Sequence, residues 1–287
     1  MRGAYEGALS AMRPHCIAWM LAVASSTYTI SVQAQSLGKW DERAAGTSLD
    51  VDRYRLLFDE GFDRRALKGP TTFAPVHAPY GAGIFDPPAG KAYRVEDGVL
   101  SISAYRSAGK WRSGSVQTAD ADQAAGRTPF YGGRGFACQG CYFETRMRLP
   151  AGKEPGFWGG FWLLSPNEAG SHVEIDVLEW YGGDPKGHHQ SVHIWPADHR
   201  AHVGLSNYTG TKALLDGQWH SYGARVADGI AYVYMDRREV SRLPVPPSFD
   251  TAFYPLVTLA IFPKEREIAR EGMHLDVDYI RAYRPLP

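Results

Sequence analysis

The sequence predicts an all-β fold, an antiparallel sandwich of two stacked sheets. Short apolar runs alternate with clusters of Gly, Pro, Asp and Asn, which is the pattern of strands joined by turns. Helical periodicity is almost absent. Aromatic residues make up 13% of the chain and Gly contributes 31 residues, a composition that suits a large β-core and also stacking on sugar rings.

The expected strands follow one another along most of the chain. Each combines β-branched or aromatic residues with alternating side chains, and ten of them in about 240 residues suit two sheets packed face to face. They cover residues 54–58, 99–105, 141–149, 157–164, 173–181, 190–195, 219–226, 230–235, 254–262 and 273–283. With 287 residues, 44% of them hydrophobic, the chain is long enough for one large domain, expected over residues 53–287.

The first residues have the features of a secretory signal peptide, expected over residues 1–34. Arg2 and Arg13 precede the apolar run 17–26, and small residues follow near position 34. An uncleaved membrane anchor is the alternative. Residues 35–52 form a polar lead segment. The expected location is therefore secreted or periplasmic, with no membrane contact once the signal is removed.

The charge balance limits the classes of partner that the protein is expected to bind. Lys plus Arg and Asp plus Glu both count 31, and no basic run is present that would suit nucleic acid or a membrane surface. A neutral partner such as a polysaccharide is expected, without nucleic acid, and the protein is expected to be a monomer.

Two cysteines remain after removal of the signal, Cys138 and Cys141. In an exported protein they can close a small loop as a disulfide. A structural zinc site normally needs four ligands, and no second Cys pair supplies them. A disulfide is the favoured interpretation.

The stretch HVEIDVLEWYGG from His172 to Gly183 places acids inside an apolar strand. Glu174 and Asp176 share a face because side chains alternate in a strand. Glu179 lies an odd number of positions after Glu174, so a regular strand would turn it into the core. A β-bulge near Val177 and Leu178 would return all three acids to one face and turn Trp180 into the core.

Three neighbouring carboxylates suit glycoside hydrolysis. Like charges held close raise the pKa of at least one of them, and a retaining mechanism needs one ionised nucleophile and one protonated acid. Asp176 could hold Glu174 through a shared proton. The alternative is a calcium site or solvated acids at a sheet edge.

The flanking runs add a possible sugar platform. In GFWGGFWLL, Trp158 and Trp162 share one face, on which pyranose rings could stack, although two Trp in a sheet-to-sheet core would give the same pattern. In QSVHIW, His193 and Trp195 share a face, and His193 could bond Asp176 or a sugar hydroxyl.

Several segments resemble, in order, the motifs of family 16 of the glycoside hydrolases, in the branch with a β-bulge in its catalytic strand that includes laminarinases and agarases. They are FDEGFD at Phe58, VEDGVLSISA at Val95, YFETRMRLP at Tyr142, GFWGGFWLL at Gly156, EIDVLE at Glu174 and LDVDYIRAY at Leu275. The resemblance implies a β-jelly roll with a concave sugar-binding cleft and retaining endo-hydrolysis of β-linked polysaccharides by the domain over residues 53–287.

The resemblance also implies roles for individual residues. Glu174 matches the nucleophile, Asp176 the assisting acid and Glu179 the general acid/base. Glu144 and Arg146 match strand residues that reach sugars in some members, and Trp162 matches a cleft tryptophan. No cofactor is required, and Asp278 is the one candidate ligand for the structural calcium that members often bind.

The substrate stays open at this stage. A β-1,3-glucan is favoured, with agar- or carrageenan-type galactans and exopolysaccharides as alternatives, and transglycosylation can replace hydrolysis. A non-catalytic glycan-binding sandwich is the alternative of another class. A metalloenzyme using His188, His189, His193 and His199 is a further alternative, but their spacing fits no metal motif.

Overall fold

The computed structural model describes residues 46–63, 79–87, 90–119, 135–166, 171–197, 202–211 and 216–287. These residues all lie within one compact unit, Gln33–Pro287. The expected signal peptide, residues 1–34, and residues 35–45 of the lead segment lie outside the described residues. Within the described part of the chain, no helix is long and apolar enough to cross a membrane.

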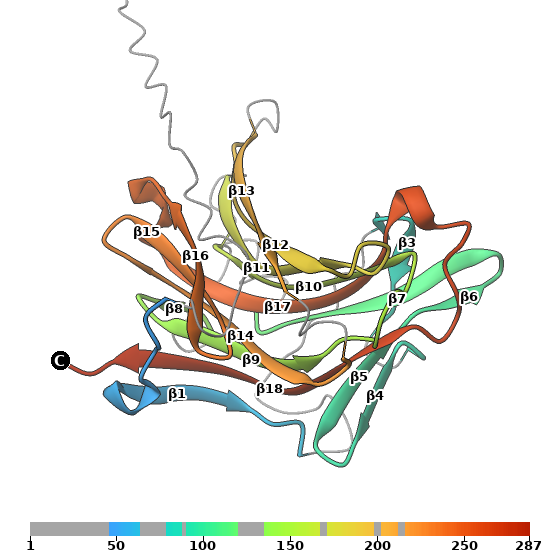
Figure 1. Cartoon of the computed structure of the whole chain (residues 1–287), viewed down its shortest axis with the longest axis horizontal. Coiled ribbons are helices and arrows are strands. Elements are labelled where there is room, and N and C mark those ends of the chain that lie inside the picture. The colour runs from blue at the N-terminus through green and yellow to red at the C-terminus, as the bar shows by residue number, and fades with distance from the viewer. Residues whose placement is uncertain are drawn as a thin grey trace, which may run out of the picture. The chain divides into compact units, whose positions relative to one another are not determined.

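Two β-sheets packed face to face form the fold, a jelly-roll type of sandwich, which confirms the predicted fold class (Figure 1). The first sheet has eight strands. In spatial order they are β16 (Arg238–Pro244), β15 (Ile230–Met235), β14 (Trp219–Ala227), β9 (Tyr142–Arg148), β18 (His274–Pro285), β5 (Val99–Ser103) and β4 (Tyr93–Glu96), with β1 (Tyr54–Glu60) paired to β18.

The second sheet has ten strands and carries the acids. In spatial order they are β13 (Val203–Gly210), β12 (Gly187–Trp195), β11 (His172–Tyr181), β10 (Phe157–Leu164), β17 (Ala252–Ile261), β7 (Lys110–Gln117), β3 (Gly83–Phe85) and β2 (Pro79–Tyr80), with β6 (Tyr105–Ser107) on β7 and β8 (Cys138–Gln139) on β17. One pair departs from the expected antiparallel pattern, because β3 and β7 run parallel. Short 3₁₀ helices are η1 (Val51–Arg53), η3 (Pro247–Phe249) and η4 (Pro263–Glu265).

Strand alternation decides which side chains enter the core between the sheets. In β10, Phe157, Phe161 and Leu163 are fully buried, and Trp158, Gly160 and Trp162 face the opposite side. Burying one such side chain stabilises the fold by roughly 1.5–3 kcal/mol. The opposite face of β10 and β11 is thereby left for polar and aromatic groups. Figure 1 shows the β12–β13 hairpin at one side of this face and β3 at the other.

The outer face of the eight-stranded sheet has a small aromatic cluster of its own. Tyr142, Tyr234 and Tyr283 pack there, with Leu49 and Tyr54 against them. This contact explains how the last residues of the lead segment are held, because they cover an apolar surface that the sandwich core cannot reach.

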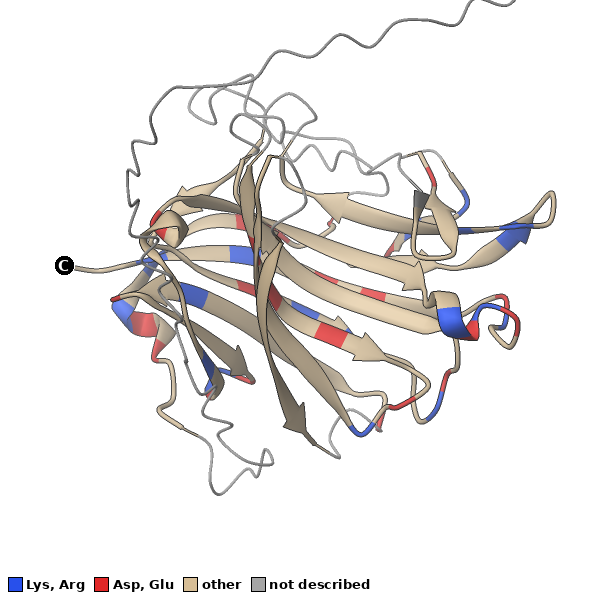
Figure 2. Cartoon of the chain, turned by 90° about the horizontal axis from the view of Figure 1, so that it is seen from above, with Lys and Arg blue, Asp and Glu red and all other residues tan. Residues whose placement is uncertain are grey.

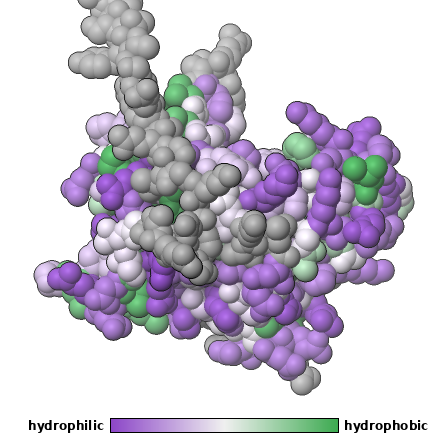
Figure 3. All heavy atoms as spheres, in the orientation of Figure 1, coloured by the Kyte–Doolittle hydropathy of each residue, from purple (hydrophilic) through white to green (hydrophobic). Residues whose placement is uncertain are grey.

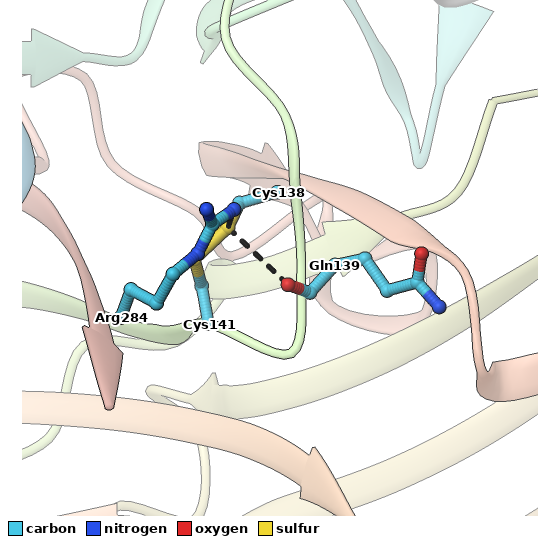
Figure 4. Close-up of a disulfide and its surroundings, with 4 residues drawn as sticks. All are labelled: Cys138, Gln139, Cys141 and Arg284. Carbon is cyan, nitrogen blue, oxygen red and sulfur yellow. Dashed lines mark hydrogen bonds between the residues drawn. A yellow bond between two sulfur atoms is a disulfide. The ribbon is translucent and has the colours of Figure 1, made fainter. Parts of the chain in front are cut away.

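The cysteines are joined as the sequence predicts. Cys138 and Cys141 form a disulfide across a turn between β8 and β9, with Cα atoms 5.8 Å apart (Figure 4). Gly140 has a φ of 67°, which an L side chain rarely adopts, and this allows the tight turn. Arg284 in β18 places a guanidinium nitrogen 3.4 Å from the Cys138 sulfur.

Exposed apolar groups are scattered over the described surface. The large ones are Leu56, Val203, Tyr208, Ile268 and Leu286; Val203 and Tyr208 both lie in β13, and the others come from separate segments. Figure 3 shows a mostly hydrophilic face with small, separated apolar patches. Scattered groups of this kind do not make an interaction surface.

Candidate active site

The predicted bulge is present in β11 and sets the direction of all three acids. Against β12, the register shifts between Asp176 and Glu179, and against β10, Leu178 pairs with Phe161 while Asp176 pairs with Trp162. The extra residue is therefore accommodated at Val177. Leu178 and Trp180 both turn into the core and are fully buried, which leaves Glu179 on the face of Asp176.

Glu174 and Asp176 form one half of the site together with two residues of β12. A carboxylate oxygen from each acid and a ring nitrogen of His193 lie within 4.8 Å of one another. His193 Nε2 is 3.1 Å from Asp176 Oδ2, and Trp195 Nε1 donates a hydrogen bond of 2.9 Å to Glu174 Oε2. The contact of His193 with Asp176, one of the two alternatives expected for this histidine, is therefore present, and Trp195, expected as a sugar contact, contacts Glu174 itself.

Glu179 forms the other half. It pairs with Gly160 of β10, so no side chain stands opposite it on that strand. Tyr181 donates a hydrogen bond of 3.0 Å to Glu179 Oε1, and the Ser191 hydroxyl lies 3.5 Å from Oε2. Both partners are neutral, so they orient this carboxyl without adding a charge.

Aromatic rings line the site as predicted, and one of them was missed. Trp158 and Trp162 lie on the face of the acids, and Trp162 Nε1 donates to the Thr258 hydroxyl at 3.0 Å. Tyr80 of β2 packs on both, with ring centroids 5.1 and 6.4 Å away. The free space among these rings and the acids is only about 10 Å³, so Tyr80 narrows the approach to Glu179, which is partly exposed.

Burial controls the protonation of the acids. It raises the pKa of Glu174 well above its usual value, and the charge of Asp176 adds to this rise, while His193 and Trp195 oppose it. It also raises the pKa of Asp176 well above its usual value, with the charge of Glu179 as the second cause. Asp176 is only 5% exposed, so it is the group on which a shared proton is best kept at neutral pH.

A second histidine, not anticipated from the sequence, completes this half of the site. His202 Nε2 lies 2.9 Å from His193 Nδ1, and the His202 ring stacks on Trp195 with centroids 4.0 Å apart. The register of β12 on β13 brings them together by pairing His193 with Gly204. A Cβ at Gly204 would lie 2.6 Å from His193 Nδ1, so this glycine leaves space for the imidazole.

The expectation that Glu144 and Arg146 contact sugars is wrong. Phe143 and Met147 of β9 are in the core, so Glu144 and Arg146 project from the outer face of the eight-stranded sheet. Glu144 is fully buried and accepts two hydrogen bonds from Arg237, of 2.9 and 3.0 Å. Neither residue lies on the sheet that carries the acids.

Asp278 does not fit the expected calcium ligand. Its carboxylate forms an ion pair of 2.6 Å with Arg146, whose guanidinium also lies over the Trp219 ring. A guanidinium at hydrogen-bond distance already neutralises the carboxylate and takes up the space that a cation would need. The contacts of this chain therefore give no support for calcium at Asp278.

The histidine metal site is not supported either. His188 is fully buried, its Nδ1 lies 2.8 Å from Gln190 Nε2, and burial lowers its pKa to about 3. Alternation along β12 turns His189 to the opposite face, where its ring packs on Tyr181 and Tyr208. His199 lies outside the described residues.

The strand that carries the bulge lies inside a segment that matches a known family. Residues 133–262 match the model of Glycosyl hydrolases family 16. This part of the chain belongs to that family. The protein is therefore a glycoside hydrolase, and the family matched is the one that its sequence motifs resemble. No match is found among the curated proteins.

Solved structures share the fold at low sequence identity. The non-specific endo-β-1,3(4)-glucanase SCLam of family 16 is 19% identical, with a TM-score of 0.66 over 84% of this chain and 96% of that chain. The laminarinase from Rhodothermus marinus is 20% identical, with a TM-score of 0.63 over 82% and 98%. LamAcat from Zobellia galactanivorans is 19% identical, with a TM-score of 0.61 over 80% of this chain and 97% of that chain.

Proposed function

We propose that this protein is a retaining endo-glycosidase that hydrolyses internal β-linkages of a polysaccharide, with a β-1,3-glucan as its substrate. The observation that carries the proposal is the bulge at Val177, because it brings Glu174, Asp176 and Glu179 to one face beside aromatic rings. The similar solved structures include an endo-β-1,3(4)-glucanase and a laminarinase, which supports the substrate class.

Glu174 is the proposed nucleophile. Trp195 donates to one of its oxygens, and the carboxyl of Asp176 lies within hydrogen-bond reach of it. With the shared proton on Asp176, Glu174 is ionised and oriented by two donors. It attacks the anomeric carbon, and the bond between that carbon and the leaving oxygen breaks to give a covalent glycosyl-enzyme.

Glu179 is the proposed general acid/base. It delivers a proton to the leaving glycosidic oxygen and later takes a proton from the water that releases the sugar. Tyr181 holds one of its oxygens, so the other is available to the substrate. Another sugar hydroxyl in place of water would give transglycosylation from the same intermediate.

His202 is proposed as a positioning residue. One set of protonation states is consistent with these distances and with Glu174 as the nucleophile: His202 Nε2 donates to His193 Nδ1, His193 Nε2 donates to Asp176, and the protonated Asp176 carboxyl donates to Glu174. Each proton then points toward the nucleophile. His202 fixes the tautomer of His193 and, by stacking on Trp195, also supports the other donor to Glu174.

Reducing-end release on laminarin, lichenan, agarose and carrageenan tests the substrate class. The proposal expects oligosaccharides from laminarin at the earliest times, and proton NMR should show the β-anomer forming first. Release from agarose or carrageenan alone would replace glucan by galactan as the substrate. An initial α-anomer would rule out retention.

We also propose that the protein acts outside the cytoplasm as a monomer. The charged and apolar pattern of residues 1–34 supports export, and the Cys138–Cys141 disulfide suits an oxidising compartment. The exposed large apolar side chains of the described surface are few and do not form one patch, which suits a monomer. Free thiols in protein recovered from the culture medium, labelled after denaturation without reductant, would contradict the disulfide.

A further inference from the structure

A second pocket lies on the other side of the β2–β3 hairpin from the three acids. It has a volume of about 250 Å³ and is bounded by residues 82–84 of that hairpin, by the β6–β7 hairpin and by the turn after η4. Its charged residues are Arg106, Lys110, Arg266 and Glu267. In Figure 2, basic positions lie on the β6–β7 hairpin and at η4, at one edge of the sheet.

Positive charge in this pocket is not balanced by the protein. Arg266 pairs with its neighbour Glu267 at 2.8 Å, and both side chains are well exposed. Arg106 lies over the Trp111 ring at 4.7 Å from its centroid. Among the described residues, no carboxylate lies within ion-pair distance of Arg106 or Lys110. Arg106 and Lys110 therefore line the pocket with no described carboxylate to neutralise them, although the whole chain has no net charge.

The walls of the pocket are held by contacts of their own. Trp111 is 5% exposed, and its Nε1 donates to the Arg266 carbonyl at 3.2 Å, which links the β6–β7 hairpin to the turn after η4. The Ala82 amide donates to the Ile261 carbonyl at 2.9 Å, which holds the β2–β3 hairpin on β17. The cations thus stand on a preformed surface, which lowers the entropy lost on binding.

One hairpin links the pocket to the active site. Tyr80, at one end of the β2–β3 turn, packs against Trp158 beside Asp176 and Glu179, and Ala82, at its other end, lines the pocket. Phe262, immediately before η4, packs edge-on against Trp158. A polysaccharide that passes the acids along these rings is led toward the pocket.

We propose that this pocket binds an anionic substituent of the polysaccharide, a carboxylate or a sulfate ester, on a sugar near those at the cleavage point. The inference rests on the proposed function for the polysaccharide and adds an acidic decoration to the substrate class. Arg106 offers two parallel N–H groups to such a group, and Lys110 adds a second positive charge.

The test compares a neutral β-1,3-glucan with its carboxymethylated and sulfated derivatives. The full mature protein is compared with the double variant Arg106→Ala/Lys110→Ala. A matched control, Arg55→Ala/Arg94→Ala, removes two exposed cations from β1 and β4 in the other sheet. At low salt, the pocket variant should lose about fivefold in kcat/KM on an acidic glucan, the scale of exposed ion pairs, and keep its value on the neutral glucan.

Three further comparisons decide the outcome. The loss should disappear at about 0.5 M salt and should be absent from the control variant. A loss confined to the carboxymethylated or to the sulfated glucan identifies the group recognised. An equal loss on neutral and acidic glucans, an equal loss in the control variant, or no loss on either acidic glucan would overturn the proposal.

Gel retardation in each glucan separates this proposal from the function on which it rests, because it reports binding without turnover. Stronger retardation of wild type than of the pocket variant in acidic glucan, without hydrolysis, would support the pocket and reject the endo-glycosidase. Hydrolysis of the neutral glucan with no difference in retardation would support the endo-glycosidase and reject the pocket.

Discussion

Both sheets contain buried carboxylates, and the two groups have opposite environments. Glu144 in β9 accepts two hydrogen bonds from Arg237 and one each from Tyr142 and Tyr279, at 2.8 to 3.0 Å. Among the described residues, Glu174 and Asp176 in β11 have no Lys or Arg within ion-pair distance and contact an indole and an imidazole instead.

The difference separates a structural acid from a reactive one. A buried carboxylate with a guanidinium and two phenols has every lone pair satisfied, so its removal leaves the partly buried Arg237 without its charged partner. Two neighbouring buried carboxyls without a cation share one proton. This arrangement stabilises the folded state less than a carboxylate paired with a guanidinium does, but it keeps one carboxylate ionised and available as a nucleophile. The comparison predicts opposite consequences for the same chemical change in the two strands.

The largest expected effect is on activity. Glu174→Gln should lower kcat by about 10⁴-fold, because the amide cannot form the glycosyl-enzyme. Glu144→Gln should leave kcat/KM within about twofold, measured where both variants are folded, because Glu144 faces away from the site. A loss of activity of similar size in both variants would contradict the distinction between a reactive acid in β11 and a structural acid in β9.

The next effect is on stability, where the substitution of Glu144 is expected to be the harmful one. Glu144→Gln should lower the free energy of unfolding by about 3 kcal/mol, since it leaves Arg237 without its charged partner. Urea unfolding followed by fluorescence gives this value. Glu96→Gln is the matched control because Glu96 pairs with Arg94 on the surface, where both side chains are more than half exposed, and should change stability by less than about 0.5 kcal/mol.

A smaller effect concerns pH. The pKa of Glu174 is raised in the folded protein, so its contribution to stability is full at low pH and is lost as the pH rises through the folded pKa. Glu174→Gln should therefore be more stable than wild type by about 1 to 2 kcal/mol at about pH 8 and equally stable at about pH 4. Thermal unfolding across this range measures the difference. A gain that is largest in acid would mean that the pKa of Glu174 is lowered.

The smallest expected effect concerns the donors that point toward Glu174. His202→Ala should lower kcat by about tenfold with little change in KM, because His193 loses the partner that fixes its tautomer. His202→Gln can keep an N–H near the Nε2 position and should recover part of the loss. The pH profile of kcat should shift in the alanine variant. An unchanged profile, or a loss carried only by KM, would make His202 a sugar contact instead.

The local parts of the site could be predicted from the sequence. The odd spacing of Glu179 from Glu174 required a bulge in β11, and alternation along β10 placed Trp158 and Trp162 on the face opposite the core. Both predictions depend only on neighbouring residues within one strand. Contacts between distant segments could not be predicted. Glu144 lies 93 residues from Arg237, and Tyr80 reaches Trp158 from another hairpin.

The register of strand pairs explains the remaining misses. His193 reaches His202 only because β12 and β13 pair with His193 opposite Gly204, and the apolar signal of VGLSNYTG was too weak to predict a strand there. A glycine opposite a histidine in adjacent strands was the available signal. Asp278 was assigned from resemblance alone, which could not reveal Arg146 as its partner.

The most direct test of the roles given to the acids is covalent labelling. The enzyme is incubated with an activated 2-deoxy-2-fluoro β-glycoside of its preferred sugar, which slows release of the glycosyl-enzyme more than its formation. Intact mass and peptide mapping then locate the label. We predict one label per chain, on Glu174. A label on Asp176 or Glu179, or turnover with inversion and no label, would contradict the assignment of Glu174 as the nucleophile of a retaining enzyme.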